Sequence, residues 1–375
     1  MRKNLFLVAA LAAGLSLVAC SEDKSEEIVE NDKLEMSILD PIVTTYADSV
    51  VVPTYEALME MNGALYDAVA ALCANPSDEA FEKAANAWLE SREPWEKSEA
   101  FLFGPVDALG LDPNMDSWPL DQARIEQILA SGDWSALEWT EDSEAEAAQN
   151  VRGFHTLEYL LFKDGEARTT SDEDYVKAPE AWCNYMKVVA NLLKKDATEL
   201  YEAWAVSYNG GGAYVDIFKG HNNSTYFTAL ACIEEIVDGC ITIADEVGNA
   251  KIGEPYNLDK GGYKNEALYA VESWYSWHSK DDYTNNIYSI RNAYYGSLTT
   301  PISSNSIAAL VAKQNATLDK KVKDAITAAE NAIQSIPTPF RNNIGSPESK
   351  AAMEACAGLV AVLKDLKAEI RRYFE

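Results

Sequence analysis

Apolar residues recur at helical spacing along most of the chain after residue 38. Segment 153–162 shows the pattern most clearly, because Phe154, Leu157, Leu160 and Leu161 share one face at 100° per residue. Few segments alternate as strands do, and no sheet can be built from them. The sequence therefore predicts an all-α protein. Helices are expected at about 38–73, 79–100, 121–129, 143–162, 171–204, 223–247, 266–277, 279–295 or 281–295, 317–335 and 347–373.

Glycine and proline mark the expected breaks between these helices. Pro53 is expected to break or delay the first helix, and Pro179 to kink another near its start. A turn rich in Gly and Pro is expected at 248–263. The triplet 210–212 is the clearest break, and it is no phosphate loop because no strand precedes it and no Gly-Lys-Ser/Thr follows. Helix ends are indicated by Ser77 or Asp78, by Asp121 and by Gly296.

The length of the chain indicates two domains. A chain of 375 residues is long for a single hydrophobic core, even without a leader of twenty residues. We expect two helical bundles, each similar to a four-helix bundle and packed side by side, at residues 38–210 and 211–375.

The N-terminus has the features of a bacterial lipoprotein signal peptide at residues 1–20. Arg2 and Lys3 precede an apolar stretch, 5–17, that is too short to span a bilayer comfortably. The tetrapeptide that ends at Cys20 resembles a lipobox, in which the cysteine becomes the lipidated N-terminal residue. Residues 21–37 are expected to be a flexible acidic tether. These features predict a cell-envelope protein, anchored only by lipid at the outer membrane, on its periplasmic side or at the cell surface.

The charge of the chain is strongly negative. Lysine and arginine number 31, aspartate and glutamate 60, and the formal net charge is −29. Such a field repels nucleic acid and anionic membranes and concentrates cations near the protein. We therefore exclude nucleic-acid binding, whereas a cation ligand is compatible with the charge.

The remaining cysteines are expected to be buried thiols, with one disulfide left open as an alternative. They form no Cys-x-x-Cys pair, and an odd number cannot all pair within the chain. Several lie among apolar residues of expected helices. The five are Cys73, Cys183, Cys232, Cys240 and Cys356.

The chemistry of the chain centres on His155 and Glu158. Their i, i+3 spacing places an imidazole and a carboxylate one turn apart on the same flank of a helix. Gly153 leaves room for a neighbouring backbone or a ligand to approach. Di-metal carboxylate bundles use such a pair in the order Glu-x-x-His, which is reversed here. The alternative is a partly buried histidine that pairs locally with a glutamate.

A second stripe of informative residues lies on the helix expected at 79–100. Trp88, Arg92, Trp95 and Glu99 are spaced i, i+4, i+7 and i+11. They form either a buried Arg–Glu pair under aromatic cover or a stripe that lines a ligand site. The loop after this helix, rich in Pro, Asp and Gly, is long enough to suggest a function. It holds Asp107, Asp112, Asp116 and Trp118, although acidic loop residues are commonly just solvated.

Several separated motifs resemble the imelysin family. Gly153-x-His155-x-x-Glu158 is similar to its GxHxxE signature, and the likeness extends from about residue 40 to the C-terminus. Further matching segments are 91–101, 104–105, 116–121, 275–276, 286–287, 295–296 and 339–340. The resemblance implies a pair of helical bundles with the signature facing the groove between them. It also implies an iron-regulated envelope protein of iron uptake, although some members were named peptidases.

The resemblance implies a set of site residues. His155 and Glu158 take the places of the signature, and Glu99 takes that of a carboxylate in the first bundle, so these three are the expected metal ligands. Matches to neighbouring landmarks add expected ligand-lining residues. They are Arg92, Trp95, Asp116, Trp118 and Gly153.

The donor types favour metal binding over hydrolysis. One imidazole with two carboxylates suits iron or another fairly hard transition metal, with zinc as a further candidate. The inverted metallopeptidase motif fails because Tyr159 follows Glu158, and no obvious base is left over. No Gly-x-Ser-x-Gly occurs either. We expect a monomer that binds the metal, or its chelate, for uptake with an outer-membrane partner. The alternatives are a metal-dependent peptidase or hydrolase, and a groove for haem or peptide.

Overall fold

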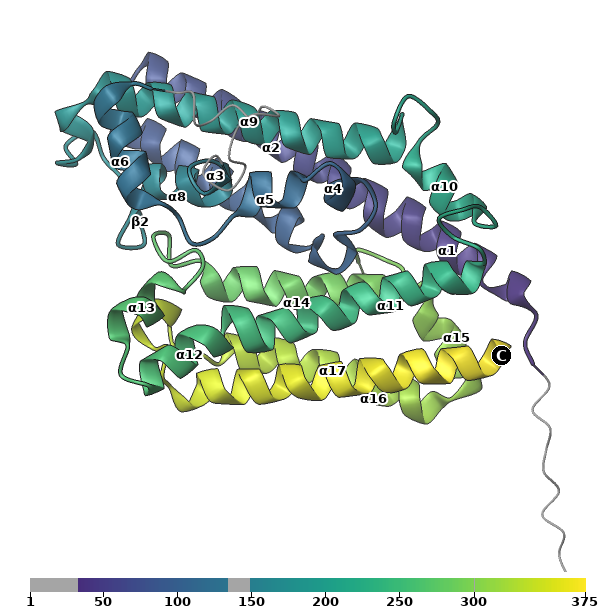
Figure 1. Cartoon of the computed structure of the whole chain (residues 1–375). Helices are drawn as coiled ribbons and strands as arrows, with labels where there is room; N and C mark the ends of the chain where they lie inside the picture. The colour runs from purple at the N-terminus through teal and green to yellow at the C-terminus, as the bar shows by residue number, and fades with distance from the viewer. Residues whose placement is uncertain (1–32, 134–148, 300) are drawn as a thin grey trace, which may run out of the picture. The chain divides into compact units, whose positions relative to one another are not determined.

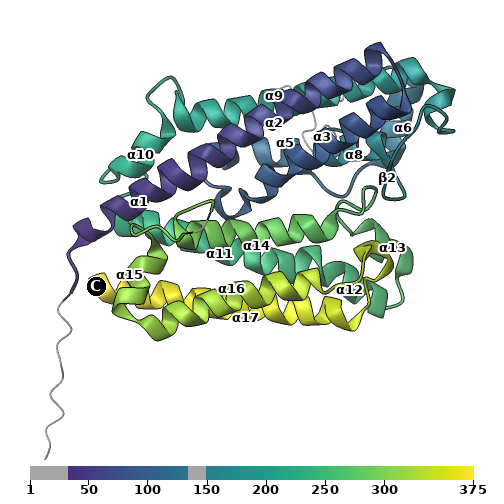
Figure 2. The same cartoon turned by 180° about the vertical axis from the view of Figure 1, so that it is seen from behind.

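The long helices lie in two layers, which the computed structural model places one above the other in Figure 1 and again in Figure 2. The first layer holds α2 (Val52–Ala74), α3 (Asp78–Glu96), α8 (Gly153–Leu161) and α9 (Pro179–Ala205). The second layer holds α11 (Ala229–Glu246), α14 (Ser279–Tyr295), α16 (Ala316–Gln334) and α17 (Pro347–Phe374). Helices α3 and α14 pack against each other between the layers.

The structure describes residues 33–133, 149–299 and 301–375, and Leu34–Glu375 group into one unit. The all-α prediction is confirmed: within those ranges the only strands are β1 (Phe162–Lys163) and β2 (Glu166–Ala167), paired antiparallel. The division of the chain near residue 210 stays a prediction. Shorter elements are η1 (Met36–Ile38), α1 (Asp40–Tyr46), η2 (Ala47–Val51), η3 (Glu99–Phe101), α4 (Pro105–Ala108), α5 (Leu111–Asp116), α6 (Gln122–Ser131), η5 (Tyr175–Lys177), α10 (Tyr214–Gly220), η6 (Val247–Lys251), α12 (Gly253–Lys260), α13 (Lys264–Tyr269), α15 (Ile307–Gln314) and η7 (Phe340–Asn342).

The predicted helix ends are confirmed at three places. The Ser77 side chain accepts a hydrogen bond from the backbone N–H of Ala80 and caps α3. Asp121 caps α6 in the same way, through the N–H of Arg124. Gly296 takes a left-handed conformation directly after α14.

One predicted effect of proline is wrong and one is confirmed. Pro179 does not kink α9 but begins it, since a proline at the first turn needs no backbone donor and disfavours helix in the residue before it. The late start expected at Pro53 is confirmed, because α2 begins at Val52, with Pro53 in its first turn, directly after the π-helical turn η2.

Other predicted boundaries also need correction. The turn expected at 248–263 is largely helical, as the π-helical turn η6 and then α12. The helix expected at 266–277 ends at Tyr269, and residues 270–278 form a loop. The helix that carries the His–Glu pair begins at Gly153, after a turn; its expected start at 143 lies outside the described residues. Helix α15 was not expected.

The short helix α8 is buried in the first layer, where it packs against α3, α5 and α9. All nine of its residues are buried, so neighbouring helices surround it on every side. Trp88 of α3 donates its indole N–H to the carbonyl of Phe154 (2.9 Å), and Trp182 of α9 donates to that of Leu160 (3.0 Å). Side chains from two long helices thus hold the backbone of α8 in place.

The five cysteines after Cys20 are free thiols. Four are buried, as expected, and Cys73 is half-buried, with its Sγ 3.3 Å from the carbonyl oxygen of Cys183. No helix in the described part of the chain is both long and apolar enough to cross a membrane.

Helix α11 approaches η3 so closely that only glycine fits at position 239. A Cβ there would lie 2.0 Å from the carbonyl oxygen of Ala100. We expect Gly239→Ala to lower the free energy of unfolding by about 1–3 kcal/mol, because α11 or η3 must shift. Gly358 in α17 has open space around its Cβ position. Gly358→Ala should raise stability by about 0.5–1 kcal/mol through helix propensity. Urea unfolding measures the stability of both variants. Equal stability changes in the two variants would contradict the close packing of α11 against η3.

Candidate functional site

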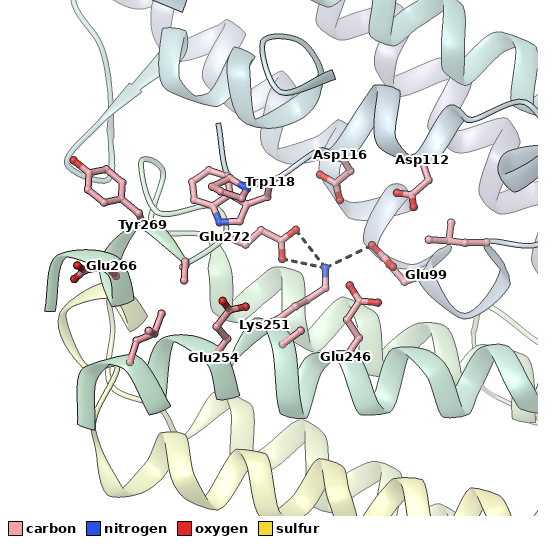
Figure 3. A pocket seen from close by; sticks show the side chains of 15 residues that line it. Glu99, Asp112, Asp116, Trp118, Glu246, Lys251, Glu254, Glu266, Tyr269 and Glu272 are labelled. Atoms are coloured by element: carbon pink, nitrogen blue, oxygen red, sulfur yellow. Dashed lines mark hydrogen bonds and ion pairs between the residues drawn. The ribbon is translucent and has the colours of Figure 1, made fainter. Parts of the chain in front are cut away.

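A pocket of about 710 Å³ lies between the residues of the two layers (Figure 3). Trp118 and Tyr269 contribute aromatic surface, and Lys251 alone among the described lining residues is basic. Seven carboxylates outnumber that single ammonium, so the pocket attracts cations and repels anions. The acidic lining residues are Glu99, Asp112, Asp116, Glu246, Glu254, Glu266 and Glu272.

His155 lies fully buried in the first turn of α8, beneath two of these carboxylates. Its Nε2 is 3.1 Å from Oδ1 of Asp116 and 3.4 Å from Oε1 of Glu272. These distances allow ion pairs, but Nε2 has no aligned hydrogen bond. The ring of Trp118 packs edge-on against the imidazole, with centroids 4.9 Å apart. On the side that faces the pocket, the imidazole is therefore held by ion pairs alone.

Gly153 allows the approach of α8 to α5 that brings His155 beside Asp116. Its φ is +83°, and a Cβ at this position would lie 2.3 Å from the carbonyl oxygen of Met115. Met115 directly precedes Asp116 at the end of α5. A residue with a side chain would force these segments apart, which explains why glycine stands at this position of the motif.

Glu158 holds the other side of the imidazole. Its Oε2 is 3.2 Å from Nδ1 of His155. Its Oε1 accepts hydrogen bonds from the backbone N–H of Tyr275 (3.0 Å) and Ser276 (2.8 Å) and from the Ser276 hydroxyl (2.7 Å). Glu158 therefore orients the histidine and fixes the loop 270–278 that carries Glu272.

The loop 270–278 is held in an unusual backbone conformation. Ser273 and Trp277 both have positive φ, of 51° and 62°. The hairpin of β1 and β2 contacts the loop, because the N–H of Gly165 donates to the carbonyl of Tyr275 (2.9 Å) and a Cβ on Gly165 would overlap Trp277. Contacts from distant parts of the chain thus place Glu272 above His155.

Arg92 of α3 joins the layers through four carboxylates. It is fully buried and forms ion pairs with Asp116 and Glu96, with Glu272 at 3.0 Å and with Asp282 of α14 at 3.3 Å. Because a buried charge needs partners, this arrangement fixes all four carboxylates.

Two groups of three residues have ligand atoms that all lie within 4.8 Å of one another. The first is Asp116, His155 and Glu272, and the second is Glu96, Glu99 and Asp116. Lys251 lies between the groups, with Nζ 3.0 Å from Oε2 of Glu272 and 3.6 Å from Oε1 of Glu99. Asp116 belongs to both groups.

Burial and ion pairs shift the pKa values of these carboxylates in opposite directions. Burial would raise the pKa of Asp116, but Arg92 and His155 outweigh it and hold that pKa below its usual range. Burial would also raise the pKa of Glu272, but its contacts with Lys251 and His155 outweigh burial and lower that pKa to about 2. Burial raises the pKa of Glu99 well above its usual value, and raises that of Asp112 to about 7. Asp116 and Glu272, the two carboxylates that face Nε2 of His155, are therefore ionised.

Most of the predicted site residues lie together. His155, Arg92 and Asp116 are in direct contact, Trp118 covers the imidazole, and the Trp95 indole donates to Oδ2 of Asp116 at 2.6 Å. Glu99 lines the pocket but belongs to the second group, and Glu158 lies behind the imidazole in neither group. Cys20 lies outside the described residues.

Five important residues were not predicted as part of the site. Asp112 lies in the loop that the sequence singles out, and Glu96 lies in a family-like segment. Glu272 lies three residues before segment 275–276, which resembles the family, and this resemblance is the signal that could have indicated it. The other two are Lys251 and Asp282, for which we find no comparable signal.

The fold and the site define an all-helical protein with a buried Asp/His/Glu group able to hold a metal ion. The sequence model of the Imelysin family, Peptidase M75, matches residues 51–366, and the chain belongs to this family. Iron-regulated protein A of Synechococcus elongatus is 28% identical over 330 residues, which cover 88% of this chain and 84% of that protein.

Solved structures show the same fold. A crystal structure described as an iron-regulated protein A precursor, from Parabacteroides distasonis, has a TM-score of 0.85 and 37% identity, and the match covers 92% of this chain and 97% of that one. An imelysin-like protein from Psychrobacter arcticum has a TM-score of 0.61 with 14% identity, covering 90% and 94%. The second likeness concerns the fold alone.

Removal of the Arg92 charge should destabilise the protein strongly at neutral pH. We expect Arg92→Met to cost about 3–5 kcal/mol, because it leaves buried carboxylates without a partner. Glu272 and Asp116 have lowered pKa values, so their contribution is present above the unfolded pKa of about 4 and is lost as the pH falls. The difference in free energy of unfolding between Arg92→Met and wild type should therefore become smaller below about pH 4.

Urea unfolding at a series of pH values measures this difference. Arg372→Met is the control, because this exposed arginine pairs with Glu369 on its own helix, and solvent screens the pair so that its loss should change stability little. A cost for Arg92→Met that matches the control would contradict a role for the network in holding the layers together.

Proposed function

We propose that this protein binds iron or another transition metal, as the ion or a chelate, for uptake at the cell envelope. The observation that carries the proposal is the position of His155, whose Nε2 faces Asp116 and Glu272 in a strongly acidic pocket. The metal is treated as cargo. The proposed ligands are Asp116, His155 and Glu272, in place of the set His155, Glu158 and Glu99 expected from the sequence. Glu158 becomes a residue that positions His155.

The residues fit a transition-metal ion by their chemistry. One imidazole and two carboxylates form an N/O donor set that suits iron, manganese or zinc better than soft copper. His155 Nε2 is a buried atom with no aligned hydrogen bond, so a metal ion there replaces only its ion pairs with Asp116 and Glu272. Glu158 holds the opposite ring nitrogen, as carboxylates commonly do for metal-binding histidines.

The relatives support iron as the metal. The proteins from Synechococcus and Parabacteroides are both named iron-regulated, and each match spans most of this chain. Regulation by iron is a property of those proteins, and its extension to this chain is part of the proposal. The pocket also has room for a hydrated ion or a cationic complex, which is compatible with a chelate as cargo.

Metal binding should depend on His155 and Asp116 more than on Glu158. We expect saturable binding of ferrous iron or zinc by the chain from residue 33 onward, measured by anaerobic calorimetry. His155→Ala and Asp116→Asn should abolish binding, because each removes a ligand. Glu158→Gln should weaken it by about 10–100-fold, because it only orients the ligand. Thermal unfolding without metal checks that the variants fold.

Two results would contradict this proposal. Absence of binding by a folded wild-type protein would exclude the free ion as cargo. Equal loss in Glu158→Gln and His155→Ala, with both folded, would restore Glu158 as a direct ligand. Each outcome changes the assignment of residues rather than the fold.

A metal-dependent hydrolase is the second candidate, and Asp112 favours it. Burial in the pocket raises the pKa of this carboxyl to about 7, which is the range of a general base. A hydrolase needs such a base beside the metal in addition to the ligands. Peptide cleavage by the metal-loaded protein that Asp112→Asn abolishes would therefore assign this function instead.

We also propose that Cys20 anchors the protein at the outer membrane. The lipobox-like sequence supports this, and the anchor would keep the binding domain at the envelope, where metal enters. Cys20→Ser should move the protein from the membrane fraction to the soluble fraction, because no lipid is attached. Fractionation followed by mass spectrometry of the N-terminal peptide measures both effects. Membrane retention of the variant would contradict the anchor.

A further inference from the structure

Lys251 occupies the centre of the acidic pocket, as Figure 3 shows. Only 8% of the residue is exposed. It is the last residue of the π-helical turn η6, and the Tyr283 hydroxyl donates to its backbone carbonyl (3.2 Å). A π-helical turn is uncommon and is frequently found at functional sites. The backbone is thus built to bring this ammonium among the carboxylates.

The ammonium contacts carboxylates of both groups that can hold a metal. Its Nζ is 3.0 Å and 3.3 Å from the two oxygens of Glu272, which belongs to the group with His155. It is 3.6 Å from Glu99, which belongs to the group with Glu96. A metal ion in either group would therefore share its ligands with a fixed positive charge.

The two groups differ in how far their ligand atoms are already engaged. His155 Nε2 in the first group is a buried atom without an aligned hydrogen bond, and solvent does not reach it. Glu96 Oε1 in the second group already forms an ion pair with Arg92. The first group is therefore the one whose ligand atoms are freer to bind a metal ion.

We propose that Lys251 is an internal competitor for the metal, whose ammonium holds the cation position between Glu99 and Glu272 until metal binds. The inference rests on the proposed function. Lysine suits this role because its charge is a compact point on a flexible stem. Glu246 and Glu254 line the same pocket and are available to receive the displaced ammonium. Such competition keeps the affinity moderate, so that cargo can be released.

The variant Lys251→Met tests the competition directly. We expect it to bind zinc and ferrous iron at least tenfold more tightly than wild type in anaerobic calorimetry, because the fixed charge is gone. Lys251→Arg keeps the charge and should not tighten binding. Lys367→Met is the matched control: it removes one charge from an exposed pair with Asp238, neither of which lines the pocket, and should leave the affinity unchanged.

A second measurement uses wild-type protein and does not depend on the folding of a variant. Metal should release the Lys251 side chain from its ion pairs with Glu99 and Glu272, so its amino group should react faster with an N-hydroxysuccinimide ester when zinc is bound. Mass spectrometry compares this rate with that of Lys367, which should not change. Slower or unchanged acylation of Lys251 under saturating metal would overturn the proposal.

The outcomes separate this inference from the proposed function. Binding by wild type that Lys251→Met does not tighten overturns the competitor role and leaves metal binding intact. Binding by Lys251→Met alone supports the competitor role and excludes the free ion as cargo of wild type. Absence of binding by both proteins, each folded, overturns both proposals.

Discussion

The buried Arg92 is the constraint on which the rest of the structure depends. Its guanidinium comes from α3 in the first layer and meets carboxylates from α5, from the loop 270–278 and from α14 in the second layer. A buried charge of this kind is tolerated only with its partners in place, so the layers cannot slide or separate without a large penalty. The same contacts place Asp116 and Glu272 on either side of Nε2 of His155. Stability and site geometry thus have one origin.

The network also explains why the pocket selects cations. Arg92 and Lys251 neutralise only part of the surrounding charge, since the pocket alone has seven carboxylates. Burial keeps the pKa of Glu96 and Glu99 high, which lowers the cost of so much acid in one place. An anion finds no free partner in Lys251 or Arg92, because both already contact carboxylates.

The sequence predicted the local part of this design and missed the long-range part. The i, i+3 spacing correctly pairs His155 with Glu158, because one helical turn determines that contact. The predicted stripe also includes Arg92 and Trp95, and both side chains contact Asp116. Glu272 was not predicted, because its loop takes shape only through contacts with Glu158 and Gly165, more than a hundred residues earlier. Periodicity extends a helix through 270–277, and only tertiary contacts show where that helix stops.

The depth of His155 limits the chemistry that the pocket can support. The imidazole has no exposed surface and lies beneath Trp118, so a molecule in the pocket first meets the carboxylates and Lys251. A small cation can reach Nε2 by passing between Asp116 and Glu272, because it needs only their oxygens. A peptide carbonyl would need that position together with a water and a base, beside the Trp118 indole that covers the imidazole. Binding of a cation therefore requires less rearrangement of this site than hydrolysis does, whatever the family name implies.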